Sequence, residues 1–329
     1  MKALVTGATG FIGSNVVREL LAAGHEVRVL VRPGADTRNI DGLPVETAIG
    51  DLLDIESLRR AAQGCDALFH VAALYSLWAP NAQVVYRANV EGTVNVLTAA
   101  LEAGVQKAVY TSSVATISPS RNGRPSAEDA PFYEEDLIGA YKQSKYVAEQ
   151  EALRFTDKGL PVVVVNPSAP VGRGDIKPTP TGRIVLDFLR GRMPGYVDTG
   201  LNVVDVEDVA KGHLLAYEKG KVGQRYILGN SNLSLKEILV TLAQVAGRKA
   251  PVLKIPYWAA LATAYGDEFV TGRIRGKEPQ ISVDRVRLSR KHMYYDAGKA
   301  VRELGLPQTP VEEAFAKAVA WFRDNGYVR

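Results

Sequence analysis

The chain has 329 residues, of which 46% are hydrophobic and 23% are charged. These proportions are typical of a globular protein and exclude a disordered chain, a collagen and a coiled coil. The formal net charge is only +4, which does not indicate a nucleic-acid partner. At roughly 100–200 residues per domain, the length suits two domains.

The cysteine content and the lengths of the apolar runs further limit the class of protein to which the chain can belong. A single cysteine, Cys65, excludes an intramolecular disulfide and a cysteine-rich metal site, so no metal is expected. The uncharged runs 160–172 and 255–266 are shorter than the roughly 20 residues that a membrane-spanning helix needs. The first residues enter a strand-like segment directly, so we expect no signal peptide and a soluble, cytoplasmic protein.

Strands and helices are predicted to alternate over the first 166 residues. The strands are expected at 2–6, 26–32, 45–49, 67–71, 107–112 and 161–165, and the helices at 14–23, 56–63, 81–103 and within 134–158. This alternation predicts βαβ units, and therefore an α/β fold with a Rossmann-type, doubly wound parallel sheet that helices cover on both faces.

The regular alternation of predicted strands and helices ends after residue 166. Prolines at 167, 170, 178 and 180 predict a long loop, and the remainder mixes strands at 203–206 and 225–228 with helices at 184–190, 235–246 and 310–325. We therefore predict a dinucleotide-binding domain over 1–166. A smaller, mixed α/β substrate-binding domain is predicted over 167–329, with segments that return to the main sheet.

A glycine-rich turn follows the first predicted strand. Gly7, Gly10 and Gly13 have the spacing G-x-x-G-x-x-G and open a helix. Glycines permit a tight turn and the close approach of a pyrophosphate, and the helix N-terminus offers free N–H groups to it. The turn therefore predicts a dinucleotide site, with Thr9, Phe11 and Ile12 as further contacts. A merely tight strand-to-helix turn is the alternative.

The end of the second predicted strand bears on the choice between NAD and NADP. A carboxylate there would bind the ribose 2′-hydroxyl of NAD, but this chain has Arg32 instead, and Asp36 is its next carboxylate. Because a guanidinium suits a 2′-phosphate, we predict NADP(H) as the cofactor, with Arg32 and Arg38 facing the phosphate. The alternative is that Arg32 only stacks on the adenine and that NAD is also accepted.

Asp51 follows the third predicted strand. Its carboxylate is placed either to accept a hydrogen bond from the adenine amino group or to cap the helix near Glu56.

The sequence Tyr141-x-x-x-Lys145 places a phenol and an ammonium on one face of a predicted helix. A nearby positive charge lowers the pKa of a tyrosine from about 10 and makes it a usable acid–base. The spacing alone is weak evidence, because the chain contains two more such pairs, which begin at Tyr217 and Tyr295. Those two tyrosines are expected to lie on surface helices.

Position favours Tyr141 over the other two tyrosines. It lies in the half that carries the glycine turn, and it follows a strand that ends in Thr111-Ser112-Ser113. The carboxyl ends of parallel strands face the ligand crevice, where a serine hydroxyl can orient a substrate oxygen for hydride transfer.

Together these motifs resemble the extended short-chain dehydrogenase/reductase family over the whole chain. Within that family the chain most closely resembles the hopanoid-associated sugar epimerases, and it is more distantly similar to dihydroflavonol-reductase-like ketoreductases. Segments 176–183 and 321–327 support the first comparison. The family resemblance rests on Gly7-x-x-Gly10-x-x-Gly13, Asp51-Leu52, His70-Val71-Ala72-Ala73, Asn89-Val90-Glu91-Gly92-Thr93, Thr111-Ser112-Ser113 and Tyr141-x-x-x-Lys145.

The resemblance implies roles for these residues. Tyr141 is the catalytic acid–base, and Lys145 lowers its pKa and binds the nicotinamide ribose. Ser113, with Ser112 as its rival, orients the substrate oxygen. Asn89 supports the site through its helix, whereas His70 is expected to pack at a strand end rather than to carry a proton. The other expected cofactor contacts are Leu52, Val71, Ala72, Ala73, Thr111, Asn166, Pro167 and Ser168.

Departures from the family pattern bear on the reaction. Val114-Ala115 stand where dehydratases carry Asp-Glu, so dehydration is not expected. Leu201 stands where many nucleotide-sugar epimerases carry a diphosphate-binding Arg. The first hypothesis is therefore an NADP(H)-dependent oxidoreductase acting at a secondary alcohol or carbonyl. The alternative is a sugar epimerase that oxidises its substrate transiently. A cofactor-binding sensor without turnover is the third, disfavoured by the intact Tyr141.

Partners are predicted from surfaces. The helices at 81–103 and 134–158 would pair in a homodimeric four-helix bundle if the chain behaves as its relatives do. The stretch 273–302 holds nine Lys or Arg against three Asp or Glu, which suits a solvated face, an anionic substrate group or, less favoured, a lipid surface. Tyr75, Trp78 and Tyr86 are expected in core or dimer packing, or at the substrate mouth.

Overall fold

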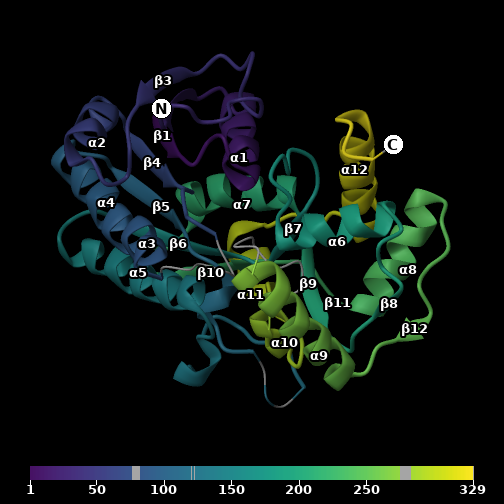
Figure 1. Ribbon diagram of the computed structural model, residues 1–329. Helices are drawn as coiled ribbons and strands as arrows, with labels where there is room; N and C mark the ends of the chain where they lie inside the picture. Colours follow the sequence, from purple (N-terminus) through teal and green to yellow (C-terminus); the bar gives the residue numbers. More distant parts are fainter. Residues whose placement is uncertain (76–81, 120, 122, 275–282, 329) are drawn as a thin grey trace.

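The computed structural model describes residues 1–75, 82–119, 121, 123–274 and 283–328. Its centre is a seven-stranded, wholly parallel sheet with the strand order β10-β6-β5-β4-β1-β2-β3, so the predicted Rossmann-type fold is confirmed (Figure 1). The strands are β1 (Lys2–Thr6), β2 (Glu26–Val31), β3 (Glu46–Ile49), β4 (Ala67–His70), β5 (Lys107–Thr111), β6 (Val162–Pro167) and β10 (Arg225–Leu228).

Helices cover both faces of this sheet, because alternate residues of each strand point to opposite sides. Val5 packs into one core with α1 (Phe11–Ala22) and α7 (Val206–Lys219). Its neighbour Leu4 packs into the other, with α2 (Ile55–Ala62), α4 (Gly92–Glu102) and α5 (Ala140–Asp157). Figure 1 shows these two helical layers with the sheet between them. Double coverage explains the nearly continuous valine run of β6.

The helix predicted over 81–103 is interrupted. It consists of α3 (Ala82–Tyr86), a π-helical turn η1 (Arg87–Glu91) and then α4. A π turn inserts an extra residue into a helix and is frequent at functional sites, and here it carries Asn89. The periodicity of the sequence does not reveal this turn.

The second half adds a four-stranded sheet in which β9 (Gly200–Asp205) pairs with β7 (Ala169–Val171), β11 (Ser231–Ser234) and β13 (His292–Met293). A third core joins α6 (Pro180–Leu189), α8 (Leu235–Ala246) and α12 (Val311–Asp324). The remaining elements are η2 (Val114–Thr116), η3 (Glu134–Asp136), β8 (Gly195–Tyr196), β12 (Leu253–Lys254), α9 (Tyr257–Asp267), η4 (Glu268–Ile274), α10 (Val283–Leu288) and α11 (Gly298–Leu304).

Two boundaries in this half differ from the prediction. The expected proline-rich loop contains β7, and it ends where Pro180 opens α6 behind the cap residue Thr179, since proline suits the first turn of a helix. The helix α7 was predicted only in part, through the expected helical position of Tyr217. It begins directly after β9 because the Asp205 side chain accepts a hydrogen bond from the backbone N–H of Glu207.

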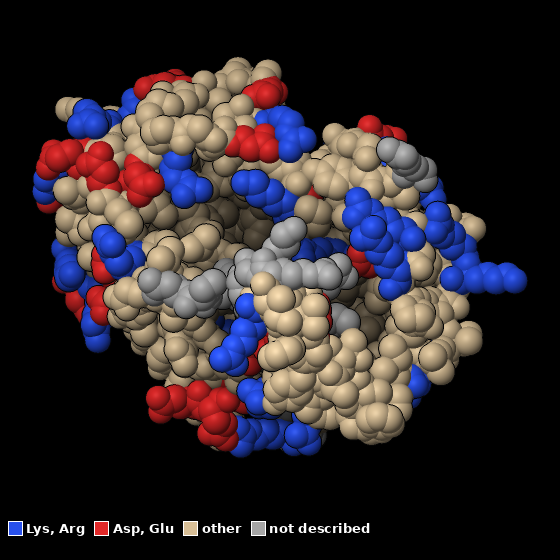
Figure 2. Space-filling model, viewed as in Figure 1, with Lys and Arg blue, Asp and Glu red and all other residues tan. Residues whose placement is uncertain are grey.

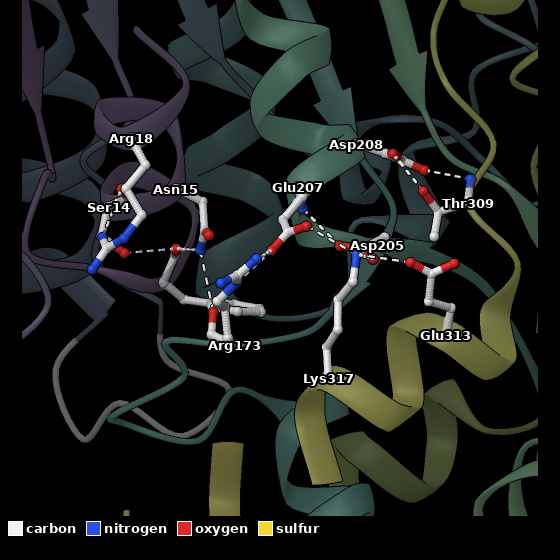
Figure 3. Close-up of polar contacts among 11 residues, drawn as sticks. Ser14, Asn15, Arg18, Arg173, Asp205, Glu207, Asp208, Thr309, Glu313 and Lys317 are labelled. Atoms are coloured by element: carbon white, nitrogen blue, oxygen red, sulfur yellow. Dashed lines mark hydrogen bonds and ion pairs between the residues drawn. The ribbon is translucent and has the colours of Figure 1, made fainter. Parts of the chain in front are cut away.

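A polar cluster links the two halves (Figure 3). Lys317 on α12 pairs with Asp205 at 2.8 Å and with Glu207 at 2.9 Å. Arg173 pairs with Glu207 as well, and its backbone oxygen accepts a hydrogen bond from Asn15 on α1. Together with β10, which joins the main sheet, this cluster ties the second half to the cofactor end.

Among the described residues, no helix is both long and apolar enough to span a bilayer.

Candidate active site

A cavity of about 1470 Å³ lies along the carboxyl edge of the main sheet, and Figure 2 shows the viewed face hollowed near its centre. Loops after β1, β2, β4, β5 and β6 line one side, and segments around 175–184 and 199–202 of the second half line the other. Ordinary ligand pockets measure about 300–1,000 Å³, so this cavity has room for a dinucleotide and a substrate together.

The glycine turn forms one end of the cavity. Gly7 has a φ of 72°, and a Cβ atom there would lie 2.6 Å from the backbone nitrogen of Ala72. A Cβ atom on Gly13 would lie 2.1 Å from the Gly7 carbonyl oxygen, so α1 packs against the turn only with glycine at this place. The N-terminus of α1 has neither a capping side chain nor an acidic residue in its first turn. These residues fit a dinucleotide, whose phosphates would bind the free N–H groups.

The two arginines that were predicted to face the cofactor, Arg32 and Arg38, differ in position after β2. Arg32 is exposed and lines the cavity. Arg38 is not among the lining residues. Its guanidinium is paired at 2.7 Å with Asp36, which does line the cavity, and that hydrogen bond lowers the pKa of Asp36 to about 2. The contact of Arg38 with a 2′-phosphate stays a prediction. Lys177, which the sequence analysis missed, lines the same end.

Asp51 lines the cavity beside Leu52, and its carboxylate accepts a hydrogen bond from the backbone N–H of Leu53 at 2.9 Å. The cap of α2 is a different residue, Asp54, which accepts from the N–H groups of Glu56 and Ser57. The capping alternative for Asp51 is thus wrong.

Tyr141 is half-buried at the start of α5 and lines the cavity. Burial raises its pKa to about 12, and a hydrogen bond with the Ser113 side chain opposes that rise only in part. The net shift is therefore opposite in direction to the predicted one, because burial outweighs the other influences. The Lys145 ammonium donates to the Tyr110 hydroxyl at 2.9 Å and to the Thr111 carbonyl oxygen at 2.7 Å, and its effect on the Tyr141 phenol stays a prediction.

Lys145 is itself 1% exposed and lines the cavity. Burial lowers its pKa to about 7, against the opposing charge of Glu149 one turn further along α5. Two other neighbours are neutral near pH 7, because burial raises the pKa of Tyr110 well above its usual value and lowers that of His70 to about 3.

The two candidate serines have different surroundings. The Ser113 hydroxyl accepts a hydrogen bond from the backbone N–H of Ala115 at 3.1 Å. The hydroxyls of Ser112 and Ser168 are buried and, within the described part of the chain, have no hydrogen-bond partner. All three serines line the cavity. Because buried hydroxyls nearly always find a partner, Ser112 and Ser168 fit contacts with a bound molecule.

The two candidate asparagines lie behind the cavity wall. Asn89 donates to the Ser144 hydroxyl at 3.0 Å and exchanges hydrogen bonds with the backbone of Leu74, which holds the segment after β4. Asn166 is fully buried and does not line the cavity. Its amide donates to the Ser113 carbonyl oxygen at 3.0 Å, so the predicted contact of this side chain with nicotinamide is wrong.

Glu149 organises this buried layer, and the sequence analysis missed it. Its side chain is 0% exposed and accepts hydrogen bonds from Asn166 at 2.8 Å, Thr116 at 2.9 Å and Arg225 at 3.0 Å. Its only sequence signal is the helical spacing from Lys145. Because Asn166 and Thr116 both also bind the Ser113 carbonyl oxygen, Glu149 fixes the strand end that carries the serines.

Of the other two tyrosine pairs, one prediction fails. Tyr217 lies half-buried on α7, whereas Tyr295 is 1% exposed, outside any helix, and lines the cavity. Tyr75 lines it too and packs edge-on against Tyr141 with ring centroids 4.5 Å apart. Tyr86 does not line it, and Trp78 lies outside the described residues.

Where the structure describes the predicted basic stretch, Arg273, Arg287, Arg290 and Arg302 are exposed, as a solvated face requires. Part of the stretch falls outside the described residues. In the remainder, Lys291 pairs with Asp136, and Lys299 donates to Gln224 and to the backbone of Arg225. His70, as expected, packs between two hydroxyls, Thr6 at 2.7 Å and Thr93 at 3.0 Å. Among the residues that the structure describes, no cluster of His, Cys, Asp and Glu suits a metal ion.

The site residues are therefore gathered in one cavity with three exceptions, Arg38, Asn89 and Asn166. The predicted residues that line it are Gly7, Thr9, Gly10, Phe11, Ile12, Gly13, Arg32, Asp51, Leu52, Val71, Ala72, Ala73, Thr111, Ser112, Ser113, Tyr141, Lys145, Pro167 and Ser168.

Comparisons with known proteins agree with this fold and site. Residues 3–229 match the NAD dependent epimerase/dehydratase family. A protein of Synechocystis with the provisional name dihydroflavonol 4-reductase is 51% identical over 99% of this chain and 95% of its own. Sterol demethylase protein B of Methylococcus capsulatus is 36% identical over the full length of both chains. The crystal structure of gox2253 superposes with a TM-score of 0.88, at 48% identity and 99% coverage of each chain.

Proposed function

The chain belongs to the NAD-dependent epimerase/dehydratase family of extended short-chain dehydrogenases/reductases, and on that premise we propose that it reduces a ketone to a secondary alcohol with NADPH. Its first half would hold the cofactor, and its second half, from residue 167, would supply most of the substrate contacts. The observation that carries the proposal is that Tyr141, Ser113 and Ser112 line one cavity together with the glycine turn.

A tyrosine with a pKa near 12 is a phenol at neutral pH. A phenol donates a proton, and a carbonyl oxygen needs one as it becomes an alcohol. Ser113 already shares a hydrogen bond with this phenol, and the Ser112 hydroxyl is free to bind the same oxygen. These groups are therefore placed to protonate and to orient a carbonyl oxygen in the direction of reduction.

Each residue has a separate task in this reaction. The bound nicotinamide supplies the hydride. Ser113 and Ser112 orient the carbonyl oxygen, and Tyr141 delivers the proton to it. The resulting phenolate is stabilised by the Lys145 ammonium, which lies on the same face of α5 one turn away.

We infer the NADP(H) preference from Arg32, which lies at the cavity end where an NAD enzyme would carry a carboxylate. The exposed Lys177 adds a second positive charge there. Together they offer a 2′-phosphate two cationic partners.

Epimerisation is the second candidate, because the family name includes it. In that reaction the hydride would leave the substrate and return to its opposite face without net consumption of cofactor. Leu201 lines the cavity where a diphosphate-binding Arg would be expected, so this candidate has no cationic contact at that place for a nucleoside-diphosphate sugar.

The test is a spectrophotometric screen of ketones, aldehydes and sugar nucleotides with NADPH and with NADH. We expect lasting loss of the reduced-nicotinamide absorbance with a ketone and NADPH, and loss of turnover by about 10²–10⁴-fold in Tyr141→Phe. Product formation without net absorbance change would instead favour epimerisation. Full activity of Tyr141→Phe on a true substrate would refute the mechanism.

We also infer a homodimer that pairs α3, α4 and α5 with their counterparts. Val84, which is 54% exposed on α3, supports this inference. Light scattering at micromolar concentration tests it, and a monomeric mass would refute it.

A further inference from the structure

We propose that Lys142 binds a carboxylate on the substrate, so that the substrate is an oxo acid rather than a neutral ketone. This inference rests on the proposed function, because it names the substrate class of the same site. It stands on the position of one buried ammonium and on the charges around it.

Lys142 follows Tyr141 on α5 and lines the same cavity, yet it is only 6% exposed. Among the described residues, its ammonium makes one hydrogen bond, to the backbone oxygen of Asp136 at 3.4 Å. That distance exceeds the usual 2.7–3.2 Å, and an ammonium has three protons to donate. A buried cation with so little compensation is costly, and burial accordingly lowers its pKa.

Asp136 is the carboxylate whose charge acts on Lys142 and opposes the effect of burial on its pKa, but it is shared with other cations. One of its oxygens pairs with Lys291. The other has no hydrogen-bond partner among the described residues and lies 3.8 Å from Arg121, which is itself paired with Glu135. Three cations thus face two carboxylates, which leaves one positive charge uncompensated. Tyr295, which Asp136 also influences, is a neutral phenol, because burial raises its pKa.

The helix adds to this positive potential. Lys142 lies in the first turn of α5, an 18-residue helix whose N-cap, Gly139, has no capping side chain and whose first turn has no acidic residue. A cation is unfavourable at a helix N-terminus, and an anion is favourable there. A ligand anion would therefore be stabilised both by the ammonium and by the helix.

The rest of the lining bears on the kind of anion. Leu201, Ile184 and Met293 line the cavity from the second half. The two cations that this half adds to the lining, Lys177 and Arg183, act on the carboxylates of Asp36 and Asp175. A carboxylate carries the single charge that Lys142 can neutralise. Because Tyr141 and Lys142 are consecutive, the carboxylate and the reacting carbonyl lie in neighbouring parts of one substrate.

The test compares the three acetylbenzoate ring isomers with their methyl esters, which lack the negative charge and carry one methyl group more. Binding is measured by calorimetry in the presence of NADP⁺, which cannot reduce the ketone, and turnover is measured separately with NADPH. We expect Lys142→Met to weaken binding of the preferred acetylbenzoate by about 10-fold to 100-fold, since a charge-assisted hydrogen bond is lost. Binding of the ester should change less than about 3-fold.

Two further variants serve as controls. Lys142→Arg keeps the charge and should restore most of the carboxylate affinity. Lys158→Met, at the exposed end of the same helix, should leave both ligands unaffected. Lys142→Met should also unfold at the same temperature as the unmodified protein or higher, because it removes a buried cation.

The outcomes separate this inference from the proposed function. Reduction of the esters with no Lys142-dependent preference for the acids would overturn the carboxylate site and leave the reductase standing. Lys142-dependent binding of acids without reduction of any ketone would support the site and count against the reductase. Equal losses for acid and ester in Lys142→Met would overturn the inference as well.

Discussion

Among the described residues, Glu149 is the one carboxylate whose charge raises the pKa of Lys145. Replacing Glu149 by glutamine removes that charge. At about 6 Å, the usual separation of side chains four residues apart, two unit charges interact by roughly 3 kcal/mol at an effective dielectric constant of about 20. That energy corresponds to about two pKa units. Because Arg225 neutralises part of the charge of Glu149, we expect a net fall of about one unit in the pKa of Lys145.

The sign of the effect on activity follows from the role of Lys145. Its charge stabilises the Tyr141 phenolate, so turnover falls as pH rises through the pKa of Lys145, which is about 7. A fall of about one unit leaves roughly 3% of the ammonium charged at pH 7.5, compared with roughly 24% before. We therefore expect kcat in Glu149→Gln to fall by about 8-fold at pH 7.5 and only about 2-fold at pH 6.

The assay is kcat against pH from 5.5 to 9, with Glu151→Gln as the control. Glu151 lies on the same helix, but its charge is paired at the surface with Arg154, so its profile should match that of the unmodified enzyme. A merely structural role for Glu149 would lower kcat by the same factor at every pH. A profile of that shape, or an unshifted basic limb, would refute the reasoning.

Three more changes test other parts of the structure. Arg32→Gln should raise KM for NADPH by roughly 10-fold and leave KM for NADH nearly unchanged; an unaltered preference would contradict the assignment. Gly13→Ala places a Cβ 2.1 Å from the Gly7 oxygen, so the free energy of unfolding, measured by thermal unfolding, should fall by about 1–3 kcal/mol. Titration should also show weaker cofactor binding, and native-like cofactor affinity would contradict this packing. Lys317→Met leaves the buried Asp205 without its cation, and urea unfolding should reveal a loss of about 1–3 kcal/mol; an unchanged unfolding midpoint would show that Asp205 needs no partner.

The main sheet could be predicted because each pattern that indicates one of its strands or helices spans a short stretch of sequence. Apolar strands, helical spacing and the glycine turn each lie within about 20 residues. The rule that parallel strands end at a common edge then brings Gly7, Ser113 and Tyr141 toward one place. The boundaries moved by a few residues where caps such as Asp205 and Thr179 decide them.

The rest depends on contacts between distant segments. The spacing of Tyr141 and Lys145 predicted that both lie on one face of a helix. The position of the Lys145 ammonium is set by its burial and by its hydrogen bond to the Tyr110 hydroxyl. Likewise, Lys142 becomes unusual only when the chain folds it into the cavity and brings Lys291 onto Asp136. No periodicity in the sequence records these long-range relations.

The return of β10 to the main sheet limits how this enzyme can be recombined with relatives. Arg225, the first residue of that strand, forms an ion pair with Glu149. In a chimera joined at residue 166, the buried Glu149 and the arginine that pairs with it would come from two different proteins. Graft points after residue 228 would keep that pair together with α7 and its contacts to α1. Exchange of substrate preference between relatives is therefore expected to succeed more often with segments such as α6 and the region beyond β10 than with the whole second half.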